Sequence, residues 1–370
     1  MTIKARAALL HGLNEPLTIE DIELDEPGFG QVLVEMKAVG ICHSDLHIIE
    51  GHIPTGFPAL LGHEAGGVVV RCGPGVSSVA PGDHVIPLFA AECRSCANCT
   101  SGKSNLCLAK PPGFTEGPAT FNGTRVYQGT IGTFATHSVI DEISLAKIRP
   151  DAPLDQAFYM GCGVTTGVGA AVFTADVKPG SSVIVFGLGG IGLNVVQGAR
   201  LAGAAQIIGV DLNPAREQIA REFGLTHFVN PDTINEPLVD NLMALSEGGA
   251  DYVFEVIGNT TLMEQAMSVA NPYWGTVVVV GLSPHGQTMA VSPWNLLFGQ
   301  TLKGSWFGGA RGRSDVPKIV DWFMAGRIKV ADLVTHRLPF DQINEGFDLL
   351  RRGESIRTVL TFEEAGAVPQ

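Results

Sequence analysis

The chain is poor in charged residues and in aromatic residues, and it contains no long hydrophobic run. Of its 370 residues, 16% are charged and 7% are aromatic, whereas 45% are hydrophobic. This composition can bury large cores and differs from that of a disordered chain. No stretch of about 18 uninterrupted apolar residues occurs, so we expect no membrane span. The start, MTIKARAALLHG, lacks the apolar run of a signal peptide.

Positive charge is also scarce. The chain has 24 Lys and Arg against 37 Asp and Glu, a formal net charge of -13. Such a surface repels phosphate backbones and anionic headgroups, so we expect neither nucleic acid nor a membrane as a partner. We expect a cytoplasmic location, where disulfides are rare, and the seven cysteines therefore need another explanation.

The chain is too long for one ordinary core, and its pattern changes near residue 164. Before this point, apolar runs cut by Gly, Pro and Asp predict a β-rich domain, although the turn-rich stretch 111–133 carries no clear prediction. After it, apolar strands alternate with helical stretches, which predicts the α/β class with a doubly wound parallel sheet. We expect a β-rich domain over 1–163, a sheet domain over 164–306, and a return to the first domain over 307–370.

A glycine turn in SSVIVFGLGGIG fits the pattern G-x-G-x-x-G with Gly187, Gly189 and Gly192. A lone match is weak, but here a strand precedes it, a helix follows, and the next strand ends in Asp211. The turn and the helix N-terminus would hold a pyrophosphate. Asp211 would bind ribose hydroxyls and repel a 2′-phosphate, which favours NAD over NADP. A doubly wound domain without a nucleotide is the alternative.

Four cysteines form a specific motif, Cys93-x2-Cys96-x2-Cys99-x7-Cys107. Thiolates at this spacing on one loop can converge tetrahedrally on zinc. A closed set of four leaves no place for substrate, so the predicted role is structural. An iron–sulfur cluster, whose usual spacings differ, and unliganded thiols are the alternatives.

Three further residues of ligand type stand in separate motifs: Cys42 in GICHSDLH, His63 in GHEAGG and Cys162 in GCGVTTG. Each alone is more often a buried cysteine or a core histidine. Together they supply three ligands and an open position, the pattern of a catalytic zinc site. Because Cys162 precedes the nucleotide domain, it could place the metal beside the nicotinamide. The remaining cysteine, Cys72, matches no ligand position and is expected to be a buried thiol.

On these motifs, together with VFGLGGIG and SIRTVL, the chain resembles the zinc-dependent alcohol dehydrogenases of the medium-chain dehydrogenase/reductase family over nearly its whole length. Its second half resembles the branch of glutathione- and mycothiol-dependent formaldehyde dehydrogenases and aryl-alcohol dehydrogenases. The resemblance implies a GroES-like catalytic domain, a Rossmann domain, NAD and two zinc ions per chain. It also implies a homodimer or a homotetramer.

The resemblance implies catalytic roles for several residues. Cys42, His63 and Cys162 match the catalytic zinc ligands, and Glu64 matches the acid beside the metal. Ser44 matches the hydroxyl that takes the alcohol proton. His47 matches the outer end of the relay, and its imidazole can pass a proton to solvent. Zinc lowers the pKa of a bound alcohol as it does for water. A purely surface or capping role for Ser44 and His47 is the alternative.

The resemblance also implies cofactor contacts. His43 matches a pyrophosphate contact, Thr166 a nicotinamide contact and Arg357 a phosphate contact. The full predicted set is His43, Thr166, Gly187, Gly189, Gly190, Ile191, Gly192, Asp211, Arg216 and Arg357.

The predicted substrate is a primary alcohol that is apolar, aromatic or allylic, because Phe89, Leu282 and Trp306 match pocket positions. Ordinary core aromatics are the alternative for Phe89 and Trp306. Ile53, Pro111 and His47 depart from the glutathione-dependent pattern, which counts against a glutathione adduct and leaves a mycothiol adduct open.

Two other functions compete with this prediction. One is an aldehyde dismutase that keeps NAD bound through purification. The other is a zinc-ribbon interaction module, which would leave Cys42, His63 and Cys162 unexplained.

Overall fold

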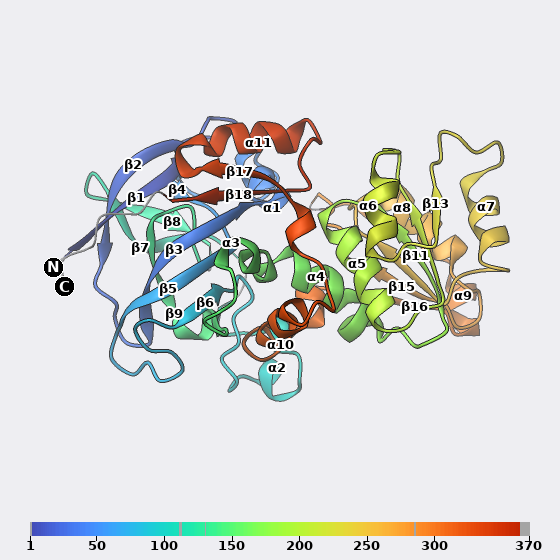
Figure 1. The fold of residues 1–370 in the computed structure, drawn as a ribbon, viewed down its shortest axis with the longest axis horizontal. Coiled ribbons are helices and arrows are strands. Elements are labelled where there is room, and N and C mark those ends of the chain that lie inside the picture. The colour runs from blue at the N-terminus through green and yellow to red at the C-terminus, as the bar shows by residue number, and fades with distance from the viewer. Residues whose placement is uncertain (1, 111–112, 130, 285, 363–370) are drawn as a thin grey trace. The chain divides into compact units, whose positions relative to one another are not determined.

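The structure, a computed structural model, describes residues 2–110, 113–129, 131–284 and 286–362 (Figure 1). The chain forms two compact units. The first comprises Met1–Cys162, Arg311–Gly326 and Val330–Gln370, and the second comprises Gly163–Ala310 and Arg327–Lys329.

The first unit contains a closed barrel of five strands in the order β1-β2-β7-β8-β4. The strands are β1 (Thr2–Leu10), β2 (Thr18–Asp25), β4 (Ala59–Leu60), β7 (Thr115–Phe121) and β8 (Thr124–Gln128). Burial alternates along the first part of β1, as expected for a strand with one face on a core. The last two strands come from the turn-rich stretch that carried no clear prediction.

A seven-stranded sheet shares this core. Its order is β10-β6-β5-β3-β18-β17, and β9 also pairs with β3. The strands are β3 (Gln31–Ile41), β5 (Ala65–Cys72), β6 (His84–Pro87), β9 (His137–Asp141), β10 (Leu145–Lys147), β17 (Val334–Pro339) and β18 (Arg357–Thr361). Helix α11 (Ile343–Arg351) packs on β17, β18 and β3 (Figure 1). The C-terminal segment therefore completes the first unit, because β18 pairs with β3.

Further helices belong to the first unit. They are α1 (His43–Ile49), α2 (Ala97–Thr100), α3 (Leu154–Ala157) and α10 (Gly312–Met324). Sequence analysis predicted no helix at α1. Its seven residues are too few to establish a helical period.

The second unit is a six-stranded sheet in the order β13-β12-β11-β14-β15-β16, with all pairs parallel. The strands are β11 (Ser182–Phe186), β12 (Gln206–Val210), β13 (His227–Val229), β14 (Tyr252–Glu255), β15 (Thr276–Val279) and β16 (Thr301–Gly304). This is the doubly wound order, with its switch point between β11 and β14. The predicted α/β class is confirmed.

Five regular helices accompany this sheet, and α5 packs on α6 as α7 does on α8. They are α5 (Gly190–Leu201), α6 (Arg216–Phe223), α7 (Leu238–Leu245), α8 (Thr260–Val269) and α9 (Pro293–Phe298). Helix α6 begins later than the sequence suggests, because the Asn213 side chain accepts the Ala215 N–H at 3.0 Å and forms a turn there.

Helix α4 (Gly163–Gly169) and its π-helical continuation Ala170–Ala175 were not predicted. The sequence GVTTGVG is rich in glycine and β-branched residues, which disfavour helix. Close packing accounts for the glycine: a Cβ on Gly167 would lie 2.5 Å from Ile191 O on α5.

Within the described part of the chain, no single helix has the length and apolarity to cross a membrane. One bent pair, Leu154–Gly161 with Gly163–Ala175, meets the test on length and composition alone.

Candidate metal centres and nucleotide-binding turn

Three ligand-type side chains from distant parts of the sequence meet in the first unit. Cys42 lies between β3 and α1, His63 lies in the turn before β5, and Cys162 follows the 3-10 turn Phe158–Gly161. Together with Glu64, they bring their ligand atoms within 4.8 Å of one another. Both cysteines and Glu64 are buried. The Cys162 thiol hydrogen-bonds to Cys42 and holds the pKa of Cys42 well below its usual range.

The donor set of this cluster fits a zinc ion. His63 Nδ1 lies 3.1 Å from Asp45 Oδ1. The other ring nitrogen, Nε2, is buried and has no hydrogen-bond partner among the described residues. A histidine oriented by a carboxylate, with its second nitrogen left over, is the usual arrangement of a zinc ligand. Two thiols and this imidazole would hold the ion and leave a fourth position.

Asp45 supports His63 through this hydrogen bond, a role that was not predicted from the sequence. Its side chain is 1% exposed, and it also accepts the Gly62 backbone N–H at 3.0 Å. Burial alone would lower the pKa of His63, but Asp45 and Cys42 raise it well above its usual value. Asp45 thus pairs with Nδ1 and leaves Nε2 as the nitrogen that would bind a metal. The available signal was an acid three residues after Cys42 in the motif GICHSDLH.

Glu64 lies in the cluster beside a buried arginine. Neither carboxylate oxygen has a hydrogen-bond partner among the described residues, although Arg357 Nε lies 3.5 Å from Oε2. Burial raises the pKa of Glu64 to about 8, although Arg357 lowers it. Arg357 is 3% exposed and donates to Ile41 O and to the Tyr159 hydroxyl, the latter at 2.9 Å. Sequence analysis gave no sign of Tyr159, and the predicted phosphate contact of Arg357 stays a prediction.

The predicted relay residues lie on α1. Ser44 Oγ is 3.8 Å from Cys42 Sγ, so its hydroxyl is next to the cluster. His47 stands one turn further along, in the last turn of the helix, and its Nδ1 lies 3.1 Å from His52 Nδ1. His43 begins the helix and is exposed. The structure therefore places Ser44 and His47 on one short helix that follows directly after Cys42, a predicted metal ligand.

Phe89 lies next to the cluster, against His63. Its ring meets the His63 ring edge-on, with centroids 5.8 Å apart, and it also packs against the barrel core. Ile53 is half-buried and packs against the same core. Pro111 lies outside the described residues. Leu282 and Trp306 belong to the second unit and are 47% and 39% exposed.

The four-cysteine loop brings all four sulfurs together, as its spacing predicts. The Sγ atoms of Cys93 and Cys99 are 3.8 Å apart, and those of Cys96 and Cys107 are 4.0 Å apart. These distances agree with the edge of a tetrahedron around zinc, about 3.8 Å for Zn–S bonds of about 2.3 Å. All seven cysteines of the chain are free thiols.

Backbone N–H groups point at these sulfurs. Cys93 Sγ accepts from Cys96 N at 3.3 Å and from the Ser95 hydroxyl at 3.4 Å, while Cys96 Sγ accepts from Leu108 N at 3.5 Å. The Ser95 hydroxyl, more than any other contact, lowers the pKa of Cys93 to about 6. These contacts favour the thiolate at Cys93, the form that binds zinc, whereas burial raises the pKa of Cys99 to about 12.

Glu92 ties this loop to α10. Its side chain is 3% exposed and accepts from the Arg313 backbone N–H at 2.7 Å and from the Ser314 hydroxyl at 3.3 Å. Arg94 donates to the same carboxylate at 3.2 Å. An acid next to the first cysteine therefore binds the N-terminus of a helix that lies far away in the sequence.

The glycine turn of the second unit has the predicted geometry. Gly187 has φ +95°, a conformation that L side chains rarely adopt. A Cβ on Gly192 would meet Gly187 O at 1.8 Å, whereas Gly189 has nothing within 4 Å of its Cβ position. The first and third glycines are thus required by the turn itself, and the second leaves open space for a ligand. Gly190 and Ile191 begin α5 directly behind it.

Asp211 lies at the end of β12 and faces this turn. Its Oδ2 accepts the Leu188 N–H at 2.7 Å, and its Oδ1 accepts the Asn213 N–H at 2.8 Å. Arg216 is the first residue of α6, and Thr166 is half-buried on α4. The acid thus stands beside the open glycine turn, where the predicted nucleotide would lie.

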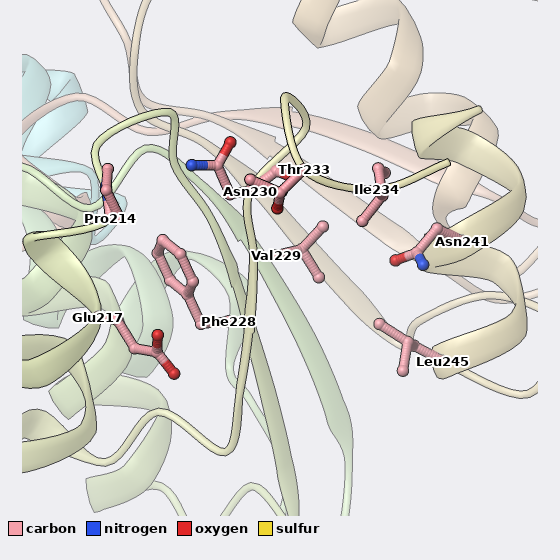
Figure 2. Close-up of a pocket in the computed structure, with 9 residues that line it drawn as sticks. All are labelled: Pro214, Glu217, Phe228, Val229, Asn230, Thr233, Ile234, Asn241 and Leu245. Carbon is pink, nitrogen blue, oxygen red and sulfur yellow. The ribbon is translucent and has the colours of Figure 1, made fainter. Parts of the chain in front are cut away.

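A pocket lies beside β13, where Asn230 also donates to Leu212 O at 3.0 Å (Figure 2). None of the residues that line it is one to which the sequence assigns a role. They are Pro214, Glu217, Phe228, Val229, Asn230, Thr233, Ile234, Asn241 and Leu245.

The chain matches two family descriptions. Residues 28–150 match "alcohol dehydrogenase GroES-like domain", and residues 190–325 match "zinc-binding dehydrogenase". It is 49% identical to a class-3 alcohol dehydrogenase of Cereibacter sphaeroides, over 97% of this chain and 100% of that protein. It is 47% identical to an S-(hydroxymethyl)glutathione dehydrogenase of Paracoccus denitrificans, with the same coverage.

A solved structure gives the same family. The crystal structure of benzyl alcohol dehydrogenase from Acinetobacter calcoaceticus is similar with a TM-score of 0.89 at 27% identity, covering 98% of this chain and 100% of that one. The relatives and the two clusters of ligand-type side chains agree with this likeness. The chain belongs to the zinc-binding alcohol dehydrogenases of the medium-chain dehydrogenase/reductase family.

Proposed function

We propose that the protein oxidises a primary alcohol group reversibly to the aldehyde, with NAD as hydride acceptor, at the cluster of Cys42, His63 and Cys162. The observation that carries this proposal is the meeting of these three side chains with Glu64, within 4.8 Å of one another. His63, with its second nitrogen unpartnered, adds to it. The four thiols of the 93–107 loop would hold a second, structural zinc.

Each residue of the site has a defined task in this proposal. A zinc ion held by Cys42, His63 and Cys162 would polarise the alcohol oxygen and make its proton easier to remove. The Ser44 hydroxyl, 3.8 Å from Cys42 Sγ, would take this proton, and His47 would pass it on to solvent. Asp45 fixes the His63 ring, and Glu64 stands next to the ligands as a movable acid.

NAD would lie at the glycine turn of the second unit. The open space at Gly189 admits the pyrophosphate, and the Asp211 carboxylate favours ribose hydroxyls over a 2′-phosphate. Arg216 at the start of α6, Thr166, His43 and Arg357 are the further proposed contacts. Exchange of Asp211 for serine should therefore raise the relative rate with NADP.

For the substrate we favour the hydroxymethyl adduct of a thiol such as glutathione. The relatives named S-(hydroxymethyl)glutathione dehydrogenase or class-3 alcohol dehydrogenase support it at 47% and 49% identity. The apolar, aromatic or allylic alcohol is the second candidate. Phe89 beside His63, the apolar Ile53 and the likeness to a benzyl alcohol dehydrogenase support it.

A rate panel tests both candidates. Formaldehyde would be offered alone, with glutathione and with mycothiol, and benzyl, allyl and simple aliphatic alcohols would be offered in parallel, each with NAD and with NADP. We expect formaldehyde oxidation that requires the thiol and prefers NAD. Faster turnover of benzyl alcohol would favour the second candidate, and no turnover of any substrate with either cofactor would refute the proposed activity.

The exposed face around β16 suggests a homo-oligomer. β16 is the edge strand of its sheet, and large apolar side chains nearby stay exposed, among them Trp294 at 65% and Leu297 at 74%. Tyr273 and Phe298 pack against each other on this face. Such an edge is suited to pairing with a second copy. Sedimentation should find a dimer or tetramer, and Leu297→Asp should shift it toward the monomer.

A further inference from the structure

A second group of ligand-type side chains lies at the end of α1, outside the two clusters described above. His47, Glu50 and His52 each offer a ligand atom, and these atoms lie within 4.8 Å of one another. His47 and Glu50 are half-buried, and His52 is exposed. Two imidazoles and one carboxylate are ligands that suit zinc, nickel and copper.

The backbone at this helix end fixes the group in place. Gly51 has φ +81°, its N–H donates to Ile48 O at 3.0 Å, and the His52 N–H donates to His47 O at 2.8 Å. This pair of hydrogen bonds is the Schellman motif, which reverses the chain after a helix and places the residue after the glycine against the last turn. In most such motifs that contact is apolar. Here it joins His52 to His47.

The distances within the group are those of a chelate. The two Nδ1 atoms are 3.1 Å apart, and Glu50 Oε2 lies 3.6 Å from His52 Nδ1. Two imidazole nitrogens on one tetrahedral zinc would be about 3.3 Å apart, given Zn–N bonds of about 2.0–2.1 Å. The arrangement therefore needs little movement to receive an ion, and solvent can reach it through His52.

We propose that His47, Glu50 and His52 form a third divalent-metal site, and that an ion bound there inhibits the enzyme. A metal on Nδ1 of His47 leaves a proton on the remaining ring nitrogen, so this imidazole can no longer accept one. The inhibitory part rests on the proposed function, because it requires His47 to be the outlet of the proton relay. The binding part depends only on the geometry of the three side chains.

Nickel binding to the untagged, zinc-loaded enzyme tests the site directly. Equilibrium dialysis should find one nickel ion per chain in addition to the resident metals. His52→Gln should weaken this binding at least about tenfold, since even outer-shell changes cost 10–100-fold. His227→Gln is the matched control, because His227 is exposed on β13 and belongs to no such group among the residues that the structure describes. Absence of the extra nickel, or unchanged binding in His52→Gln, would overturn the proposal.

A second variant separates ligand loss from loss of geometry. Gly51→Ala keeps all three ligands but strains the turn that brings His52 to His47, because φ is +81° there. We expect weaker nickel binding with unchanged zinc content. Nickel binding as tight as in the unmodified chain would refute the role assigned to the turn.

Rates measured in the same samples test the inhibitory part. Nickel should slow the unmodified enzyme and should slow His52→Gln much less, each compared with its own rate without nickel. Nickel that binds without slowing the enzyme would overturn this part and count against His47 as the relay outlet. An enzyme that turns over none of the substrates would refute the proposed function and leave the dialysis result to judge the site.

Discussion

The two cysteine-containing clusters of the first unit are built in opposite ways. Four ligands of one cluster come from a single segment, 93–107, and their sulfurs are held by N–H groups of the same loop. The other cluster draws on three separate places in the chain. Cys42 follows β3, His63 lies in the loop before β5, and Cys162 follows the 3-10 turn Phe158–Gly161. The first cluster is local in sequence and partly exposed, whereas the second is distributed and its residues are buried except for the half-buried His63.

This difference predicts that the local cluster contributes mainly to the stability of the fold and the distributed cluster mainly to the reaction. A local loop with few apolar residues depends on its metal for structure, so loss of the metal should act on folding. The distributed cluster is held by elements that the barrel and sheet already fix, and by the buried side chains of Asp45 and Arg357. Loss of its metal should act on activity and leave the fold.

The largest expected effect is that of Cys42→Ser on turnover. Without this ligand the proposed catalytic zinc should be lost, and the rate should fall about ten-thousandfold or more, because a metal supplies several kcal/mol of transition-state stabilisation. Zinc per chain, circular dichroism and rate would be measured together. Cys72→Ser is the control, since this thiol belongs to neither cluster of the described residues and hydrogen-bonds to Val79 O at 3.6 Å. Full activity in Cys42→Ser would break the distinction between the clusters.

Cys99→Ser should act in the opposite way. It removes a thiol that lies 3.8 Å from Cys93 Sγ, so one zinc should be lost and the free energy of unfolding should fall by about 3–5 kcal/mol, as for other losses of a metal. The folded fraction should keep most of its turnover. Denaturant unfolding and zinc analysis would measure both effects. A variant as stable as the unmodified chain would show that the loop needs no metal.

The same contrast explains what the sequence could predict. The loop spacing and the glycine pattern identified the Cys93 cluster and the turn at Gly187 because both depend on neighbouring residues. Cys42, His63 and Cys162 were grouped by ligand type, because no local spacing joins residues on three separate elements, and the family resemblance supported this grouping. The α/β class followed from the alternation of apolar strands and helices.

The supporting residues escaped prediction for a physical reason. Asp45 and Tyr159 act through contacts with His63 and Arg357 that the tertiary fold creates, and no local pattern marks either residue. His52 meets His47 through the turn at Gly51, which the sequence pattern did not indicate. The barrel strands β7 and β8 and helix α4 were missed because turn residues and glycines hide their periods. In each case long-range packing overrides the local preference.

Glu92 offers a smaller test of how the local loop is attached. Its carboxylate accepts the Arg313 N–H at 2.7 Å in a buried place, so Glu92→Ala should cost about 1.5–3 kcal/mol. Zinc content should stay unchanged. Asp25→Ala is the control, because Asp25 pairs with Arg125 at the surface and should contribute at most about 1 kcal/mol. Equal losses in the two variants would contradict a special attachment of the loop to α10.

The smallest effect concerns Asp315 in the first turn of the same helix. Burial raises the pKa of this carboxyl, but hydrogen bonds from Arg311 and Lys318 outweigh it and hold the pKa below its usual value. A carboxylate whose pKa is depressed by folding stabilises the protein above its unfolded pKa of about 3.9, and this stability is lost as pH falls through the folded pKa. Asp315→Asn should therefore cost about 1 kcal/mol near neutral pH and progressively less in acid.

Urea unfolding of the unmodified chain and of Asp315→Asn at each pH from about 7 to about 3 would measure the difference in their free energies of unfolding. The comparison removes the effect of acid on the zinc thiolates, because both proteins share it. Asp348→Asn is the control, since Asp348 pairs with Arg351 at the surface and its variant should differ little at any pH. If the difference in free energy of unfolding for Asp315→Asn stays constant as the pH falls, the charge of the Asp315 carboxylate does not stabilise α10.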